Sequence, residues 1–130
     1  MPVTIDWYIE NHVLLVIYSG DVTIDDIRQQ YEKGIALSES VNTPMVHLIV
    51  ELDNLQSFPK RIADYKSVAG EKAKNSGWVI LVGENKMIRF IASIVSNVMK
   101  TRYTYVSTRE DALAYIQERD SSVLSNANEH

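Results

Sequence analysis

The chain has 130 residues, of which 45% are apolar and 23% charged, as is typical of a single folded domain. Thirteen basic and seventeen acidic residues give a net charge of −4 without a dense Lys/Arg stripe, which argues against a nucleic-acid partner. The absence of cysteine excludes disulfides and thiolate metal sites. No apolar run approaches the roughly 20 residues of a membrane-spanning helix. We expect one cytoplasmic domain over residues 1–120, no integral membrane segment, and a flexible tail over 121–130.

The chain begins with a pattern typical of a β-hairpin. Residues 3–9 and 12–20 are rich in β-branched and aromatic side chains, which favour strands. Glu10 and Asn11 between them supply turn chemistry. The sequence therefore predicts two antiparallel strands at the start of the fold.

A helix and a buried strand are predicted next. Thr23 followed by Asp26 resembles a capping box, and apolar residues then recur at helical spacing at Ile24, Ile27, Tyr31 and Ile35. Pro44 stops any extension of this helix. Residues 45–52 form a nearly continuous apolar run, as expected of a strand covered on both faces. We predict that this third strand is central.

The second half of the chain continues the alternation of helices and strands. Pro59 suits the first turn of a second helix, whose apolar face is formed by Ile62, Tyr65, Ala69 and Ala73. Residues 78–83 read as another buried strand, and residues 86–100 are strongly helical.

A short strand at 103–107 and a last helix complete the pattern, because Thr108 and Asp111 repeat the cap signature. The order ββαβαβαβα predicts an α/β fold. Strands joined by single helices favour right-handed parallel crossovers, so we expect a five-stranded, mostly parallel mixed sheet with helices packed against it. The strands at 13–18, 45–51 and 78–83 should pair in parallel.

This order, with an apolar strand running into "ELDNLQSF", resembles the STAS domains of bacterial anti-sigma-factor antagonists, and SpoIIAA-like proteins in particular. In the phosphorylated members of that family, a Leu-x-x-Leu-like strand end leads to Asp-Ser-Ser-Gly, whose first serine is phosphorylated by a partner kinase. Aligning Leu52 and Leu55 with that pattern puts Pro59 and Lys60 where the Asp-Ser pair should stand. The resemblance implies a regulatory or interaction module that lacks the phosphoacceptor. Ser57 then reads as a loop hydroxyl before a helix.

Polar residues follow the predicted strand ends, where open parallel sheets tend to bind ligands. The ligand-binding candidates are Asp53, Asn54, Ser57, Glu84, Asn85 and Lys86. Solvated turns are the alternative, because such loops are polar in any soluble protein. The stretch 83–86 lacks the spaced glycines of a P-loop or dinucleotide turn.

The histidines do not predict a metal site. His12, His47 and His130 lie in a hairpin, a strand and the tail, without metal-ligand spacing. His47 could be a base if Glu51 or Asp53 oriented it, but a packed, hydrogen-bonded histidine is expected inside a strand. No Gly-x-Ser-x-Gly motif and no cysteine nucleophile is present. We name no catalytic residue, metal or cofactor, and keep an enzyme using Asp53, Glu84 and Lys86 as a third hypothesis.

The predicted third helix carries an apolar arc of about 200°, wider than packing on one sheet requires. Phe90 and Ile94 at one margin and Met99 at the other could face a partner chain, unless neighbouring elements cover them. We therefore predict a non-catalytic module that acts by non-covalent protein binding, with these residues at a homodimer or partner interface. The alternative is a binder of a lipid or other apolar ligand between helices and sheet. A deep apolar cavity of about 300 Å³ or more would favour it.

Overall fold

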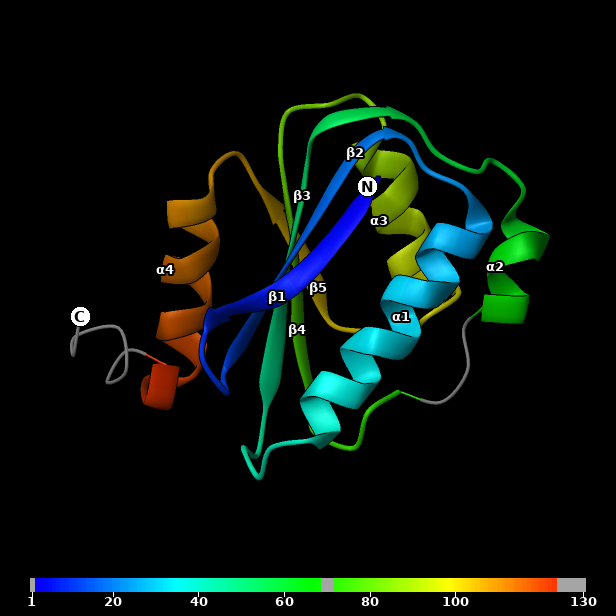
Figure 1. Ribbon diagram of the computed structural model, residues 1–130. Helices are drawn as coiled ribbons and strands as arrows, with labels where there is room; N and C mark the ends of the chain where they lie inside the picture. Colours follow the sequence, from blue (N-terminus) through cyan, green and yellow to red (C-terminus); the bar gives the residue numbers. More distant parts are fainter. Residues whose placement is uncertain (1, 69–71, 124–130) are drawn as a thin grey trace.

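The computed structural model describes residues 2–68 and 72–123. The elements follow the predicted order, ββαβαβαβα (Figure 1). They are β1 (Val3–Ile9), β2 (Val13–Asp21), α1 (Ile24–Glu39), β3 (Val46–Ser57), α2 (Ile62–Val68), β4 (Ser76–Val82), α3 (Ile88–Asn97), β5 (Tyr103–Val106) and α4 (Arg109–Arg119). Among the described residues, no helix is long and apolar enough to cross a membrane.

The strands form one five-stranded sheet in the order β1-β2-β3-β4-β5. β1 and β2 are antiparallel, whereas β2, β3, β4 and β5 pair in parallel. Each parallel pair is joined through one helix, which carries the chain back to the same end of the sheet. The predicted mixed sheet, its parallel pairs and the central place of the third strand are confirmed.

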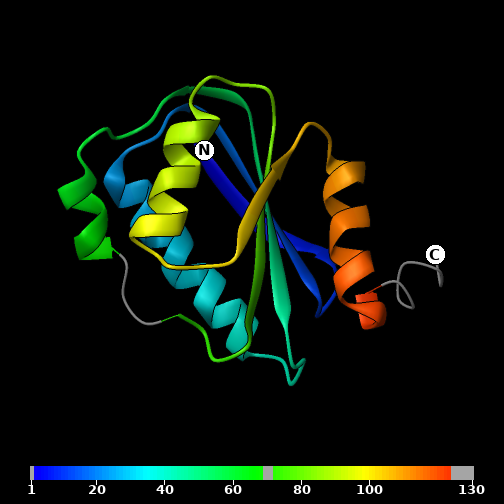
Figure 2. The ribbon, with the colours of Figure 1, turned by 180° about the vertical axis from the view of Figure 1, so that it is seen from behind.

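The helices divide unequally between the two faces of the sheet. α1, α2 and α3 lie on one face and α4 lies alone on the other, as the two opposite views show (Figures 1 and 2). The larger core, under α1, α2 and α3, includes Leu14, Val50 and Ile91. The smaller core, under α4, includes Val13 and Ile116. Alternate residues of one strand thus serve different cores.

Two predicted helix caps are present. The Thr23 hydroxyl accepts from the backbone N–H of Asp26 at 3.1 Å, and the Asp26 carboxylate accepts from the N–H of Thr23 at 2.9 Å, which completes a capping box. Thr108 accepts from the N–H of Asp111 at 3.1 Å before α4. These polar contacts determine where α1 and α4 begin.

Strand β3 is longer than predicted. It runs to Ser57 because Ser19, Gly20 and Asp21 of β2 pair with its polar end. The sequence-based end at residue 52 was wrong, since the pattern recognised only the apolar part of the strand. α2 begins at Ile62 and not at Pro59, whose carbonyl accepts from the Tyr65 hydroxyl.

The fold continues past the predicted start of the tail. Residues 121–123 are helical, and the side chain of Val123 is fully buried in the smaller core. Packing therefore extends at least three residues beyond residue 120. The remainder of the predicted tail, 124–130, lies outside the described residues.

Candidate functional site

Ser57 lies at the end of β3, beside the end of β2. Its hydroxyl donates to Oδ1 of Asp21 at 2.7 Å, and the two residues are paired in the sheet. Both side chains are exposed. The hydroxyl therefore bridges two neighbouring strands before the chain turns towards α2.

Three other predicted polar residues come together where β3 ends and α3 begins. Asp53 Oδ1 accepts from the N–H of Glu84 at 3.3 Å. The Asn85 amide donates to the carbonyl of Leu55 at 3.0 Å, and its oxygen accepts from the N–H of Met87 at 2.9 Å. These groups tie the β4–α3 loop to β3.

Asn54 and Lys86 are exposed, and neither side chain hydrogen-bonds to another described residue. The six candidates thus form no single cluster, because Ser57 contacts Asp21 and not the Asp53 group. Ligand binding by these residues stays a prediction.

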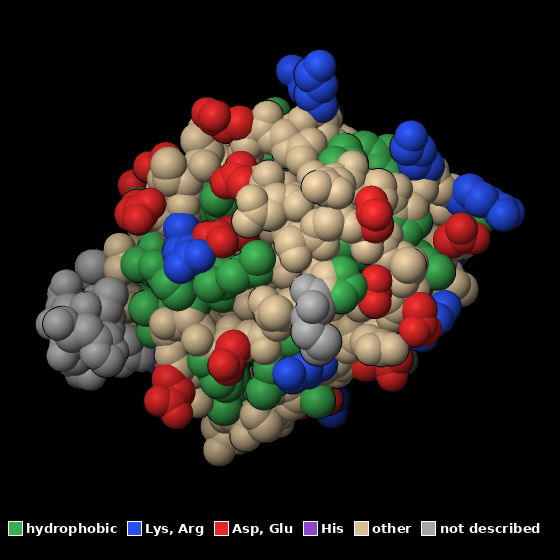
Figure 3. All heavy atoms as spheres, turned by 45° about the horizontal axis from the view of Figure 1, so that its top comes forward, with side chains coloured by type: hydrophobic (Ala, Val, Ile, Leu, Met, Phe, Trp, Pro, Cys, Tyr) green, Lys and Arg blue, Asp and Glu red, His purple; other side chains and the backbone are tan. Residues whose placement is uncertain are grey.

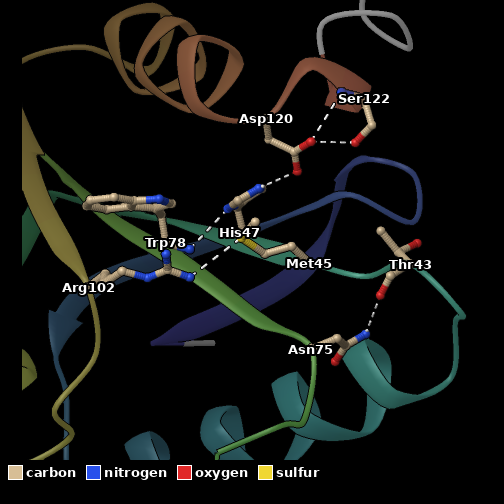
Figure 4. A network of polar contacts seen from close by, with 8 residues as sticks. All are labelled: Thr43, Met45, His47, Asn75, Trp78, Arg102, Asp120 and Ser122. Carbon is tan, nitrogen blue, oxygen red and sulfur yellow. Dashed lines mark hydrogen bonds and ion pairs between the residues drawn. The ribbon is translucent and has the colours of Figure 1, made fainter.

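A buried polar network lies at the opposite end of the sheet, around His47 (Figure 4). His47 is fully buried on β3, and its Nε2 lies 2.8 Å from Oδ2 of Asp120. Its Nδ1 accepts the backbone N–H of Trp78 at 3.0 Å. Because a backbone N–H can only donate, Nδ1 carries no proton, and the neutral imidazole donates from Nε2 to Asp120.

The Trp78 contact arises from an irregularity between β3 and β4. Val46 pairs with Ser76 but Leu48 pairs with Val79, so β4 has one residue more than β3 over this interval. The register shift leaves the N–H of Trp78 outside the β3–β4 ladder, and the imidazole of His47 accepts it instead. A Cβ on Gly77 would lie 2.5 Å from Nδ1, so the close approach of β4 to His47 requires glycine there.

Asp120 directly follows α4 and links His47 to the end of the described chain. Its Oδ1 accepts from the Ser122 hydroxyl at 2.6 Å and from the Ser122 N–H at 3.1 Å. In a nucleophilic triad the imidazole stands between hydroxyl and carboxylate. Here the carboxylate stands in the middle, so Ser122 has no base to activate it within this network.

The hypothesis that Glu51 or Asp53 orients His47 is wrong. Glu51 forms a two-point ion pair with Arg109, whose Nη2 lies 2.8 Å from Oε1. Asp120 is the partner instead, 73 positions away along the chain. No sequence motif indicates the contact between His47 and Asp120. Asp120 also lies at the predicted boundary between domain and tail, where no structural partner was expected.

The environment of His47 favours the neutral imidazole. Burial lowers the pKa of His47, and the charges of Arg102 and His12 lower it further, while the hydrogen bond and charge of Asp120 oppose them. For Asp120, burial raises the pKa, but the hydrogen bonds from Ser122 and His47 outweigh it and the pKa is lowered. A neutral imidazole beside a carboxylate is therefore the stable state near neutral pH.

Two hollows differ in character. An apolar cavity of about 130 Å³ lies between the sheet, α1 and α3, lined in part by Tyr18, Ile35 and Ile91. An open groove of about 600 Å³ lies between the β1–β2 turn, the α1–β3 loop and residues 120–122. His12 lines the groove, and its buried Nδ1 has no hydrogen-bond partner among the described residues.

The predicted interface residues of the third helix do not share one surface. Ile94 is only 3% exposed, and both it and Met99 line the apolar cavity. Phe90 is partly buried against the larger core. The Ile94 side chain therefore faces inward because α3 packs over the sheet beside α1.

A different apolar surface is open on the α4 side of the sheet. α4 packs mainly over β3, β4 and β5, and it reaches β1 and β2 only at their near end, where Val13 lies in the smaller core and Tyr8 and Leu15 pack against that core. There Tyr8, Leu15 and Ile17 are each partly exposed, and Ile17 belongs to neither core. We call these three side chains the open sheet patch. Figure 3 shows hydrophobic side chains gathered on this side, at the left of the view.

The border of the open sheet patch is charged but internally paired. The Arg109 guanidinium lies 5.5 Å from the centre of the Tyr8 ring and binds Glu51, which pairs with Ile17 in the sheet. Asp6 is exposed on β1, two residues before Tyr8 and on the same face. The patch therefore has an apolar centre and a polar rim.

No protein-family model matches the sequence, and no curated protein matches it. Among solved structures, an uncharacterized protein of the DUF3478 family with a SpoIIAA-like fold, from Shewanella loihica PV-4, superposes with a TM-score of 0.61 at 14% identity. That match covers 87% of this chain and 90% of the other. The Bacillus cell fate determinant SpoIIAA, in its phosphorylated form, has a TM-score of 0.50 at 14% identity, over 88% of this chain and 98% of its own. The chain thus has the SpoIIAA-like fold that its element order predicted.

Proposed function

We propose that this chain is a non-catalytic protein-interaction module that acts by non-covalent binding. The observation that carries the proposal is the open sheet patch, where Tyr8, Leu15 and Ile17 remain partly exposed on a face otherwise covered by α4. Apolar side chains grouped on one face with a polar rim are typical of protein contacts. The cytoplasmic location expected from the sequence stays a prediction.

The polar groups of the chain give little support to catalysis. Both imidazole nitrogens of His47 already have partners, and one of them is a backbone N–H. The Ser57 hydroxyl donates to Asp21, and Pro59 and Lys60 stand where the related antagonists carry their Asp-Ser pair. Binding without covalent change is the function that fits these side chains best.

The partner that we propose is a second copy of the chain. β1 is an edge strand, so a copy related by a two-fold axis can approach the patch without crossing another strand. The Glu51–Arg109 pair neutralises the nearest border charges within each copy. Each apolar side chain that is buried contributes about 1.5–3 kcal/mol to the free energy of association. The entropic cost of association offsets much of this gain, so we expect a weak dimer.

The third helix offers a second surface for the same function. Phe90 remains partly exposed at the margin of α3, whereas the buried Ile94 is not available to a partner. A homodimer through Phe90 and Met99 stays a prediction. The variants described below distinguish this surface from the open sheet patch.

An apolar ligand is the second candidate, favoured by the cavity under α1 and α3. At about 130 Å³ it is smaller than the roughly 300–1,000 Å³ of most ligand sites. Inside it the Tyr18 hydroxyl donates to the Gln30 amide oxygen at 2.6 Å. Native mass spectrometry of protein purified from its own host tests this candidate, since a bound ligand adds a discrete mass.

Sedimentation velocity of Ile17→Glu tests the proposed function. The variant adds one carboxylate to the open sheet patch, and Ala36→Glu adds the same charge at an exposed position of α1, on the other face. The unmodified chain and Ala36→Glu should associate as concentration rises, whereas Ile17→Glu should stay monomeric with its circular dichroism unchanged. A chain that is monomeric at every concentration would contradict self-association.

A further inference from the structure

The sheet has two edges, and they differ in length. It ends with β1 on one side and with β5 on the other (Figure 1). β5 has four residues, whereas β1 has seven, all of them uncharged except Asp6. The backbone N–H and C=O groups of an edge strand can pair with another chain, and long apolar edges are the most prone to it. β1 is therefore the edge at which a second copy could extend the sheet.

The ladder between β1 and β2 shows which backbone groups face this edge. The N–H of Ser19 donates to the carbonyl of Pro2 at 2.9 Å, so Pro2 belongs to a hydrogen-bonded pair. Hydrogen-bonded and non-bonded pairs alternate along an antiparallel ladder, and this ladder is regular from Val3 to Trp7. The N–H and C=O groups of Val3, Ile5 and Trp7 therefore point away from β2.

Asp6 already occupies one of these outward groups. Its Oδ1 accepts from the N–H of Trp7 at 2.8 Å, the distance at which the carbonyl of an added strand would bind. The register of β1 against β2 also shifts between Trp7 and Ile9, so regular pairing ends there. An added strand could thus bond regularly to Val3 and Ile5 but not past them.

We propose that Asp6 determines how two copies of this chain meet. Its carboxylate blocks extension of the sheet at the edge of β1, which leaves the open sheet patch as the surface for self-association. The role of the patch rests on the proposed function, whereas the block at the edge follows from the geometry of β1 alone.

The charge of Asp6 makes this block stronger. A register that includes Trp7 brings the carboxylate against a carbonyl of the second copy, so that two acceptors face each other. A register with Asp6 on the two-fold axis places two carboxylates directly opposite, which is destabilising. Asp6 is exposed, so its carboxylate would also lose water at such a contact. These effects oppose the pairing that the outward backbone groups would otherwise favour.

Closing this edge keeps the assembly finite. Pairing of β1 with β5 of the next copy would be a head-to-tail contact, which can repeat without end. A contact at the open sheet patch about a two-fold axis uses the same surface on both copies and stops at two. Asp6 lies two residues before Tyr8 and on the same face of β1, so its carboxylate acts both at the edge and at the rim of the patch.

Sedimentation velocity of Asp6→Thr tests the block. Threonine favours strands and has no carboxylate, so this variant should form larger species than the unmodified chain as concentration rises. Glu32→Gln removes one negative charge from an exposed position of α1 and is the control that should sediment like the unmodified chain. The proposal is overturned if Asp6→Thr also sediments like the unmodified chain at every concentration.

A double variant separates this proposal from the proposed function. Asp6→Thr combined with Ile17→Glu opens the edge and charges the patch, so it should still associate through β1. If the unmodified chain is monomeric and Asp6→Thr associates, the role of the patch is wrong and the block at the edge stands.

NMR of Asp6→Thr locates the new contact. The amides of Val3, Ile5 and Trp7 should shift as concentration rises, and association without shifts at these three amides would be incompatible with the proposal. If circular dichroism shows that Asp6→Thr is not folded, Asp6→Ala takes its place in each measurement.

Discussion

The backbone N–H of Trp78 donates to Nδ1 of His47 at 3.0 Å, so a buried imidazole replaces a main-chain acceptor where β3 and β4 lose register. Three features make this contact possible: the extra residue in β4, the glycine before Trp78 and the Asp120 carboxylate that fixes the proton on Nε2. The glycine and the carboxylate each lead to a measurable expectation about stability.

Gly77→Ala should destabilise the protein by at least about 2 kcal/mol, because its Cβ would meet His47 Nδ1 at 2.5 Å and Met45 Cγ at 2.8 Å. Gly34→Ala is the matched control on α1, where the nearest atom lies at 3.4 Å and helix propensity gains up to about 1 kcal/mol. Urea denaturation of both variants measures the difference. Equal stabilities would contradict the packing described at His47.

Stability should fall in two steps as the pH is lowered. The pKa of His47 in the folded state is below its ordinary value of 6.5, so the folded chain binds fewer protons at this ring than the unfolded chain. The free energy of unfolding that this ring contributes is therefore fully present above pH 6.5 and is lost as the pH falls from 6.5 towards the folded-state pKa. Asp120, with its pKa below 3.8, contributes stability that is lost at still lower pH, through its folded pKa. Thermal melting against pH should show the first step in the unmodified chain and not in His47→Gln.

Ser57→Ala should change stability by less than about 1 kcal/mol, because the hydroxyl and its partner Asp21 are both exposed. We also expect no phosphate on Ser57 in protein taken from host cells. Intact-mass and phosphopeptide measurements check this expectation. Substantial phosphorylation of Ser57 would show that the loop before α2 works as a switch despite Pro59 and Lys60.

Two substitutions on α3 should behave differently although both residues belong to one predicted arc. Ile94→Asp places a charge in the larger core, where Ile94 is 3% exposed, and should unfold the chain. Phe90→Asp lies at the partly exposed margin and should leave the chain folded with a lower melting temperature. Melting and sedimentation measured together decide between core and interface. A folded Ile94→Asp would contradict the packing of α3.

The sequence predicts the order of elements along the chain and both helix caps because these depend on local signals. Thr23 and Asp26 lie three residues apart, and the apolar run after Pro44 is typical of a buried strand. The polar end of β3 was not predicted. It pairs with Ser19 and Gly20 through backbone groups, and side-chain patterns in the sequence do not reveal such pairing.

The functional surfaces depend on contacts between distant residues. The arc of α3 is visible in the sequence, but only packing against α1 and the sheet shows that Ile94 is inside. Likewise Ile17 reads as an ordinary strand residue. It becomes part of the open sheet patch because α4 covers β3, β4 and β5 instead. The His47–Asp120 contact joins positions 73 residues apart and has no local signature.

Concentration-dependent NMR shifts of backbone amides in the unmodified chain test the proposed function most directly. If two copies meet at the open sheet patch, the amides of Tyr8, Leu15 and Ile17 should shift as concentration rises, while those of Lys33 and Ala36 on α1 stay constant. Shifts centred on Phe90, or no shifts at any concentration, would contradict the patch as the surface through which this module binds.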